Sequence, residues 1–203
     1  MAKLKLTKSA LKKERDALKM YLRYLPTLQL KKQQLQAEIR SVESRREDRG
    51  AKRGDLEAAA RPWLAVFGEV ERLGFGPGHF PLRVADVRTG RGNIAGVAIP
   101  VFEGVDFEAP GYDLFLTPPW VDRAVDELRA IASLDLEIRV LDEQARLLRD
   151  ELRTTSQRVN LFEKIKIPEA LRNIRTIRVY LGDQETAAVV RGKIAKGKSE
   201  GAA

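Results

Sequence analysis

The sequence predicts a mainly α-helical protein, a long antiparallel two-helix coiled coil with a short β-hairpin in the middle of the chain. Apolar residues recur at steps of three, four and seven near both ends, which is the pattern of helices that pair along a seam. The composition is 33% charged and only 6% aromatic, which is typical of extended helical proteins. Between the two helical regions the apolar period falls to two, the period of a β-strand.

The first helix is predicted over residues 1–72, with Thr7 or Ser9 as the cap of an early turn. Pro26 is expected to kink it, because proline lacks a backbone N–H and its ring clashes with the preceding turn. Glycines near Gly50–Gly54 are expected to loosen it. The apolar residues at heptad-like spacing predict the coiled-coil seam of this helix, which consists of Leu11, Leu18, Leu25, Leu35 and Ile39.

Residues 73–120 are predicted to form a loop and the β-hairpin. The alternation of Leu82, Val84 and Val87 stops at a TGRGN turn and resumes in Ile94, Val97, Ile99 and Val101. An isolated two-stranded hairpin is marginally stable in water, so this one must pack on the coiled coil or on a neighbouring protein. We expect a docking or regulatory element outside the core of the coiled coil. His79, in the preceding loop, is read as a surface or packing residue.

The second helix is predicted over residues 121–182 and is followed by a basic, partly flexible tip at 183–203. Its apolar steps of four and three imply a left-handed supercoil with the first helix. The predicted seam residues are Leu134, Ile138, Leu141, Leu148, Leu152, Val159 and Phe162. Ile165, Leu171 and Ile174 are read as the continuation of this pattern, with a bend at Pro168 between them.

The charge is unevenly distributed along the chain. Residues 1–60 carry 16 lysines and arginines against 8 acids, and residues 164–203 carry 9 against 4. Residues 61–163 carry 12 arginines against 17 acids. An antiparallel fold brings the two basic ends together, and a partner with an acidic surface would relieve their mutual repulsion.

No catalytic, cofactor-binding or metal site is expected, so the sequence does not indicate an enzyme. The chain has no cysteine and a single histidine, and it lacks a phosphate-binding loop. Its acids stand beside arginines at helical spacing, which is typical of solvated pairs on helix faces. No apolar run approaches the roughly 20 residues of a membrane span, and the charged N-terminus does not read as a signal peptide.

The stretch QRVNLFEKIKIPEALRNIRTIRVYL resembles the signature of the D subunit of V-type and A-type rotary ATPases. In that signature a Gln-Arg-Val-Asn run is followed by an Ile-Pro step. The matching residues here are Gln157, Arg158, Val159, Asn160, Ile167 and Pro168. The segments LTKSALKKERDALK and LPTLQLKKQQLQ are also similar to the first helix of that family, although Pro26 and the LPTLQL run differ from its lysine-rich opening.

This resemblance implies a non-catalytic axle of the central stalk. Its paired termini would enter a ring of catalytic and regulatory subunits, A and B, while the small F subunit clasps it and a funnel-shaped subunit links it to the membrane rotor ring. Rotation would couple ATP hydrolysis or synthesis to H⁺ or Na⁺ movement, with the bend at Pro168 making the shaft eccentric. The chain would need no cofactor, bind no nucleic acid and lie in the cytoplasm, peripheral to the membrane and not inserted in it.

Two other classes share parts of this pattern. A prefoldin-like chaperone also joins a hairpin to antiparallel helices, but would hold clients at apolar arm tips, whereas these tips are charged. A basic coiled coil that binds nucleic acid would show affinity that falls steeply with salt. A holdase assay and a binding assay at low salt would discriminate between these classes.

Overall fold

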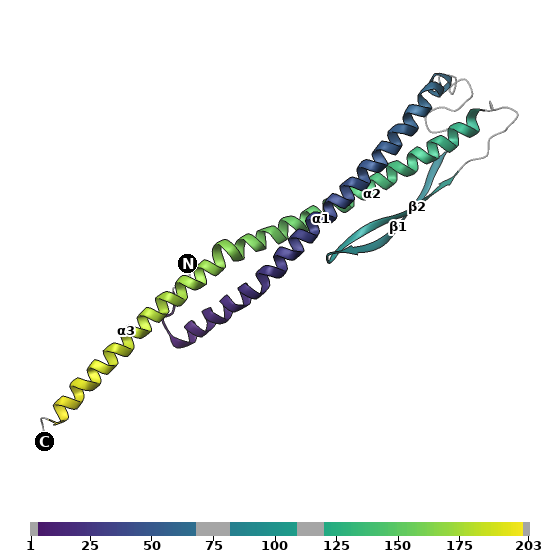
Figure 1. The fold of residues 1–203 in the computed structure, drawn as a ribbon. Helices are drawn as coiled ribbons and strands as arrows, with labels where there is room; N and C mark the ends of the chain where they lie inside the picture. The colour runs from purple at the N-terminus through teal and green to yellow at the C-terminus, as the bar shows by residue number, and fades with distance from the viewer. Residues whose placement is uncertain (1–3, 68–81, 109–119, 201–203) are drawn as a thin grey trace. The chain divides into compact units, whose positions relative to one another are not determined.

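The computed structural model describes residues 4–67, 82–108 and 120–200, and it confirms the predicted fold class. Two long helical segments pack together, with a two-stranded antiparallel hairpin between them in the chain (Figure 1). The elements are α1 (Lys8–Phe67), β1 (Arg83–Ile94), β2 (Val97–Glu108), α2 (Trp120–Leu161), the π-helical turn η1 (Phe162–Lys166) and α3 (Ile167–Glu200). The chain divides into two compact units: residues 1–32 with 153–203, called the terminal unit here, and residues 33–152, the hairpin unit.

The helix α1 begins at a threonine cap. The Thr7 hydroxyl accepts a hydrogen bond of 3.2 Å from the backbone N–H of Ala10, which satisfies one of the free donors at the helix start. The helix continues through Pro26 and past Gly50 and Gly54, where a looser segment was predicted. Each glycine destabilises the helix by about 1 kcal/mol relative to alanine. In a helix of 60 residues the tertiary contacts offset this cost.

The core of the hairpin unit is built by three elements. Leu35, Ile39 and Val42 of α1 pack against Leu141, Ala145 and Leu148 of α2, and Ile99 of β2 joins the same cluster. Ile99 is 5% exposed, so the expectation that the hairpin stands outside the core was wrong. The amide of Gln144 on α2 adds a hydrogen bond of 2.6 Å to the carbonyl oxygen of Pro100, which fixes the hairpin to the helix.

The hairpin turns at Ala95 and Gly96, not at the predicted TGRGN segment. Both turn residues have positive φ, 52° and 82°, and the Asn93 side chain accepts a hydrogen bond of 3.0 Å from the N–H of Gly96. TGRGN lies inside β1 because its glycines make room for the opposite strand. A Cβ on Gly92 would lie 2.8 Å from a methyl group of Val101.

Ion pairs join the two helices of the hairpin unit beyond its apolar core. Arg46 bonds to Asp142 at 2.6 Å and Arg49 to Glu137 at 2.8 Å. Two further ion pairs join the same helices, one between Arg53 and Asp135 and one between Glu43 and Arg149. Arg46, Arg49 and Arg53 follow Val42 at steps of four, three and four, so arginines occupy seam positions here. Each exposed pair contributes about 0.2–1 kcal/mol, and the set favours one antiparallel register.

In the terminal unit the first part of α1 packs beside the last helical segment of the chain (Figure 1). Tyr21 stacks on Phe162 with ring centroids 5.1 Å apart, and Lys8 pairs with Glu185 at 3.6 Å. The buried residues of the C-terminal segment are Thr155, Val159, Ala170, Ile174 and Ile177.

The π-helical turn η1 shifts the seam by one residue. Buried and half-buried positions follow steps of four and three from Leu141 to Phe162, but Ala170, Ile174 and Ile177 then lie 8, 12 and 15 residues after Phe162. An uninterrupted heptad pattern would place them at about 7, 11 and 14. A π turn accommodates one extra residue, which accounts for the difference.

This shift corrects the sequence reading around Pro168. Ile165 and Leu171 were read as part of the apolar pattern, yet both are 52% exposed. The N–H of Ile167 bonds to the carbonyl of Phe162 five residues back, and the wider turn gives room to the proline ring. Pro168 is therefore accommodated within a continuous helical segment.

The last helix runs past the predicted boundary at residue 182 and ends at Glu200. No helix in the described part of the chain combines the length and apolar character needed to cross a membrane. The turn-rich segment before the hairpin, including His79, lies outside the described residues, as do residues 109–119 before α2.

Candidate functional site

The terminal unit carries most of the positive charge of the chain. Its residues 1–32 and 153–203 contain 21 lysines and arginines against 7 acids, a net charge of +14. The hairpin unit contains 16 against 22, a net charge of −6. Such a separation costs free energy through repulsion within the terminal unit and attracts acidic partners to it.

The same unit exposes apolar side chains. Among the described residues, 12 of the 14 large apolar side chains that are exposed belong to the terminal unit, and only Val84 and Val101 belong to the hairpin unit. The 12 are Met20, Leu22, Tyr24, Leu30, Leu161, Ile165, Leu171, Val179, Tyr180, Val189, Val190 and Ile194. A concentration of exposed apolar side chains on one part of a protein marks an interaction surface.

The predicted seam residues differ in their burial. Fully buried are Leu35, Ile39, Leu141, Leu148 and Val159. Half-buried are Leu11, Leu18, Leu25, Leu134, Ile138, Leu152 and Phe162. In the family motif only Val159 is buried, while Gln157, Arg158 and Asn160 are exposed and Ile167 and Pro168 are half-buried.

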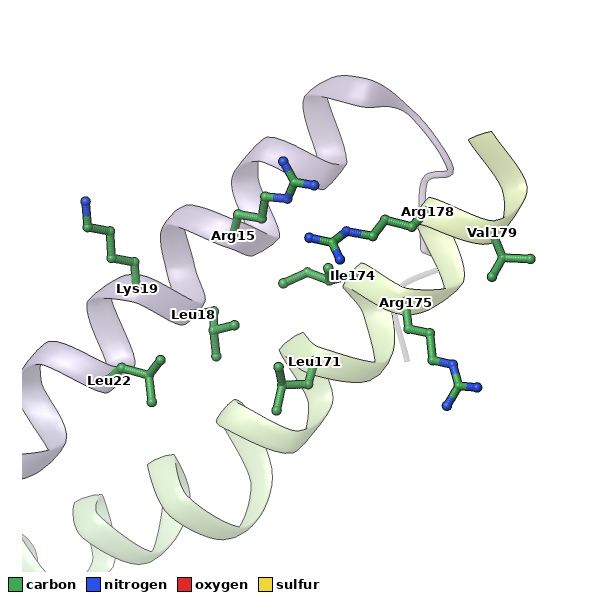
Figure 2. Close-up of a pocket in the computed structure, with 9 residues that line it drawn as sticks. All are labelled: Arg15, Leu18, Lys19, Leu22, Leu171, Ile174, Arg175, Arg178 and Val179. Carbon is green, nitrogen blue, oxygen red and sulfur yellow. The ribbon is translucent and has the colours of Figure 1, made fainter. Parts of the chain in front are cut away.

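An open groove of about 640 Å³ lies between the two helices of the terminal unit (Figure 2). Leu18 and Leu22 of α1 and Leu171 and Ile174 of α3 point into the space between the helices. The other residues around the groove are Arg15, Lys19, Arg175, Arg178 and Val179. Its lining thus combines apolar side chains with four bases and contains no acid.

Arg15 and Arg178 direct their guanidinium groups toward each other across this groove, whereas Arg175 points away from it (Figure 2). Neither Arg15 nor Arg178 forms a hydrogen bond or ion pair with another described residue. Two facing cations repel, so this arrangement is stabilised when an anion lies between them.

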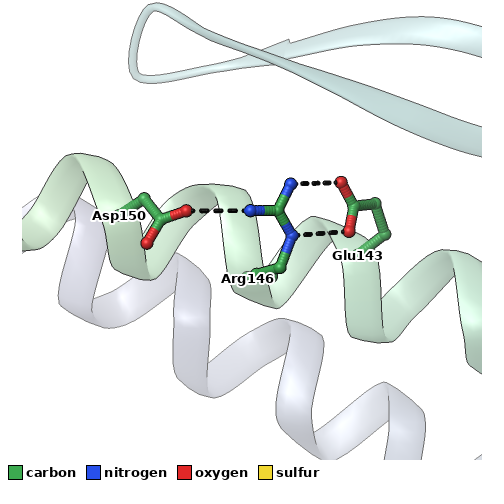
Figure 3. Close-up of polar contacts among 3 residues, drawn as sticks. All are labelled: Glu143, Arg146 and Asp150. Atoms are coloured by element: carbon green, nitrogen blue, oxygen red, sulfur yellow. Dashed lines mark hydrogen bonds and ion pairs between the residues drawn. The ribbon is translucent and has the colours of Figure 1, made fainter.

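A second polar cluster lies on the solvent face of α2, in the hairpin unit (Figure 3). Arg146 donates two hydrogen bonds to Glu143, at 2.6 and 2.7 Å, and a third to Asp150 at 3.0 Å. The hydrogen bond from Arg146 lowers the pKa of Glu143, and the same bond raises the pKa of Arg146. These residues are spaced three and four apart on one helix, which is the geometry of a stabilising helix-surface pair.

The structure gives no indication of chemistry on the described part of the chain. Within it, no group of histidine, aspartate and glutamate is arranged to hold a metal ion. The features that sequence reasoning missed are Tyr21, the seam arginines and the groove. Tyr21 could have been found, because it lies three residues after Leu18 and four before Leu25, at a heptad position.

Comparison with known proteins identifies the family. The family model for the D subunit of ATP synthase matches residues 10–197. The V-type ATP synthase D subunit of Borreliella burgdorferi is 48% identical over 200 residues, which cover 97% of this chain and 95% of the relative. The proteins of the same description from Chlamydia felis and Chlamydia muridarum are 34% and 33% identical, each over 97% of this chain and 94% and 96% of the relative.

The paired helices and the charged, apolar terminal surface define a helical protein that acts through contacts with other proteins. The chain belongs to the family of ATP synthase D subunits, whose members are non-catalytic subunits of the central stalk of V-type rotary ATPases. Other subunits of that complex are therefore its partners.

Proposed function

We propose that this chain is the rotating shaft of a V-type ATP synthase and that its terminal unit stands inside the ring of catalytic and regulatory subunits, A and B. The observation that carries the proposal is the concentration of a net charge of +14 and of 12 exposed large apolar side chains on that one unit. A socket of acidic and apolar side chains would cover both kinds of surface.

In this proposal ATP is hydrolysed or made in the ring, and rotation of the chain couples that reaction to H⁺ or Na⁺ movement in the membrane. The small F subunit clasps the shaft, with the hairpin as its docking element, and the funnel-shaped subunit joins the shaft to the membrane rotor ring. The chain lies on the cytoplasmic side of the membrane as a peripheral part of the complex.

Pro168 and the adjoining π turn are proposed to make the shaft eccentric, so that the ring interfaces meet different faces of it. The supporting observation is that a π turn with a proline interrupts an otherwise regular seam. Pro168→Ala should therefore lower the number of ions transported per ATP hydrolysed. Unchanged coupling in that variant would show that the proline has no such role.

Binding of the chain to the ring tests the location of the terminal unit. The end of α3 carries Val189, Val190 and Ile194, which are 50–60% exposed. Truncation after Ala188 removes these three side chains together with the bases Arg191, Lys193, Lys196 and Lys198. It should weaken binding to the isolated ring about tenfold or more, since each large apolar side chain alone contributes about 1.5–3 kcal/mol when fully buried. The free energy of unfolding of the isolated chain should hardly change, because these exposed side chains make few contacts within the chain.

The matched control removes exposed apolar side chains from the other unit. Val84→Ser with Val101→Ser changes the two exposed large apolar residues in the described part of the hairpin unit. This variant should bind the ring as the unmodified chain does. Equal affinity of the truncated chain and the unmodified chain would contradict the proposed location of the terminal unit.

A further inference from the structure

The groove between Leu18, Leu22, Leu171 and Ile174 has two properties that together select a ligand. Covering its apolar lining with another apolar group is favourable, because this removes apolar surface from water. Its rim carries the facing guanidinium groups of Arg15 and Arg178 (Figure 2), which repel each other until an anion lies between them. A ligand that both covers the apolar lining and neutralises the two guanidinium groups must carry a negative charge close to an apolar group.

Acids of the chain itself do not neutralise this pair in the described structure. Asp16 and Glu185 line the neighbouring groove, on which Arg15 and Arg178 also border. Glu185 is paired with Lys8 at 3.6 Å. The terminal unit has 21 bases against 7 acids, which favours a carboxylate supplied by a partner.

We infer that this groove receives a segment of a ring subunit in which an aspartate or glutamate stands next to a large apolar side chain. The carboxylate binds between Arg15 and Arg178, and the apolar side chain lies on Leu18, Leu22, Leu171 and Ile174. The identity of the occupant as a ring subunit rests on the proposed function. Arginine suits this role, because its guanidinium binds a carboxylate in a bidentate manner.

One substitution in the groove should have opposite effects on binding to the ring and on the stability of the chain. Arg178→Glu removes one of the two guanidinium groups that donate hydrogen bonds to the partner's carboxylate, and the new glutamate repels that carboxylate. The affinity for the ring should therefore fall about ten- to a hundredfold at low salt. The isolated chain should become at least as resistant to urea, since the substituted carboxylate would then face Arg15. The control Arg172→Glu makes the same change of charge at an exposed position on α3 outside the groove and should change the affinity less than about threefold.

Cross-linking in the assembled complex identifies the occupant directly. The photoreactive amino acid p-benzoylphenylalanine is placed at Leu22, which lines the groove, and separately at Met20, which is exposed on the same helix but does not line it. After irradiation, mass spectrometry should locate the Leu22 cross-link in a ring-subunit peptide with an acid within two residues. Replacing that acid by arginine should restore binding to the Arg178→Glu variant.

The outcomes separate the two proposals. Ring cross-links from Met20 but none from Leu22, or a Leu22 cross-link to a ring peptide without an acid, would overturn the inference and leave the proposed function standing. Ring cross-links from neither position would contradict the proposed function itself. Equal loss of affinity in Arg178→Glu and Arg172→Glu would show that only diffuse charge attracts the ring, which also overturns the inference.

Discussion

If the π turn η1 holds one extra residue, then one residue can be deleted there without disturbing the seam. Deletion of Lys164 places Ala170, Ile174 and Ile177 about 7, 11 and 14 residues after Phe162, which are the positions of an uninterrupted heptad pattern. The turn would then close as an α-helix. Because Pro168 cannot lie unstrained in an α-helix, the deletion is combined with Pro168→Ala.

The change in stability of each variant can be estimated from the side chains that it buries or exposes. The combined variant should be about as stable as the unmodified chain or more so, because it keeps every seam contact and loses a proline. Deletion of Lys164 alone keeps Pro168 in an α-helical turn and should cost about 3 kcal/mol. Deletion of the exposed Arg153 instead rotates Thr155, Val159 and Phe162 by about 100° out of the seam. With two large apolar side chains exposed, this control should cost about 3–6 kcal/mol.

Urea unfolding of the full chain, followed by circular dichroism at about 222 nm, measures these differences as shifts in the midpoint at an unchanged slope. The expected order of stability places the combined variant highest, the deletion of Lys164 alone below it and the deletion of Arg153 lowest. If the combined variant loses as much stability as the Arg153 deletion, η1 does not contain the extra residue of the seam.

Other predictions concern the hairpin unit. Gly92→Ala should destabilise the chain by about 1–3 kcal/mol in urea unfolding, because its Cβ would lie 2.8 Å from a methyl group of Val101. Gly54→Ala should instead stabilise it by about 0.5–1 kcal/mol, since nothing lies within 4 Å of the added methyl group in a helix; the reverse order of these two variants would contradict the described packing. Arg146→Gln should raise the pKa of Glu143, because the hydrogen bond from Arg146 lowers it. The stabilisation from this pair is present above the ordinary pKa of glutamate and is lost as the pH falls through the lowered folded-state pKa; an NMR titration that gives Glu143 the same pKa in both proteins would refute the assignment.

The coiled coil was predictable from sequence because its apolar steps are local and regular. The errors arose where the deciding interaction is not local. Ile165 and Leu171 were assigned by extending the helical pattern, and an inserted residue in a π turn leaves no separate mark in that pattern. The glycines of TGRGN indicated a turn, whereas the structure places them in β1 because Val101 on the opposite strand occupies the space beside Gly92.

Two features of the molecule depend on residues that are far apart in sequence. Arg49 at a seam position looks unfavourable until Glu137 is found opposite it, 88 residues later. The groove of the terminal unit brings Arg15 beside Arg178, and no spacing in the sequence relates them. The basic character of the terminal unit, by contrast, could be predicted, because an antiparallel fold brings two basic ends together.

The most direct test of the central claim, that this chain rotates within its ring, is to fix it to the ring at Arg158. This residue is exposed, while its neighbour Val159 is buried in the seam, and it precedes η1 in a regular part of α2. The chain has no cysteine, so the thiol of Arg158→Cys is unique in it. A disulfide from this thiol to a cysteine on a facing ring subunit should abolish ATP hydrolysis, and reduction should restore it. Full ATP turnover with the disulfide quantitatively formed would contradict rotation and make the chain a static tether.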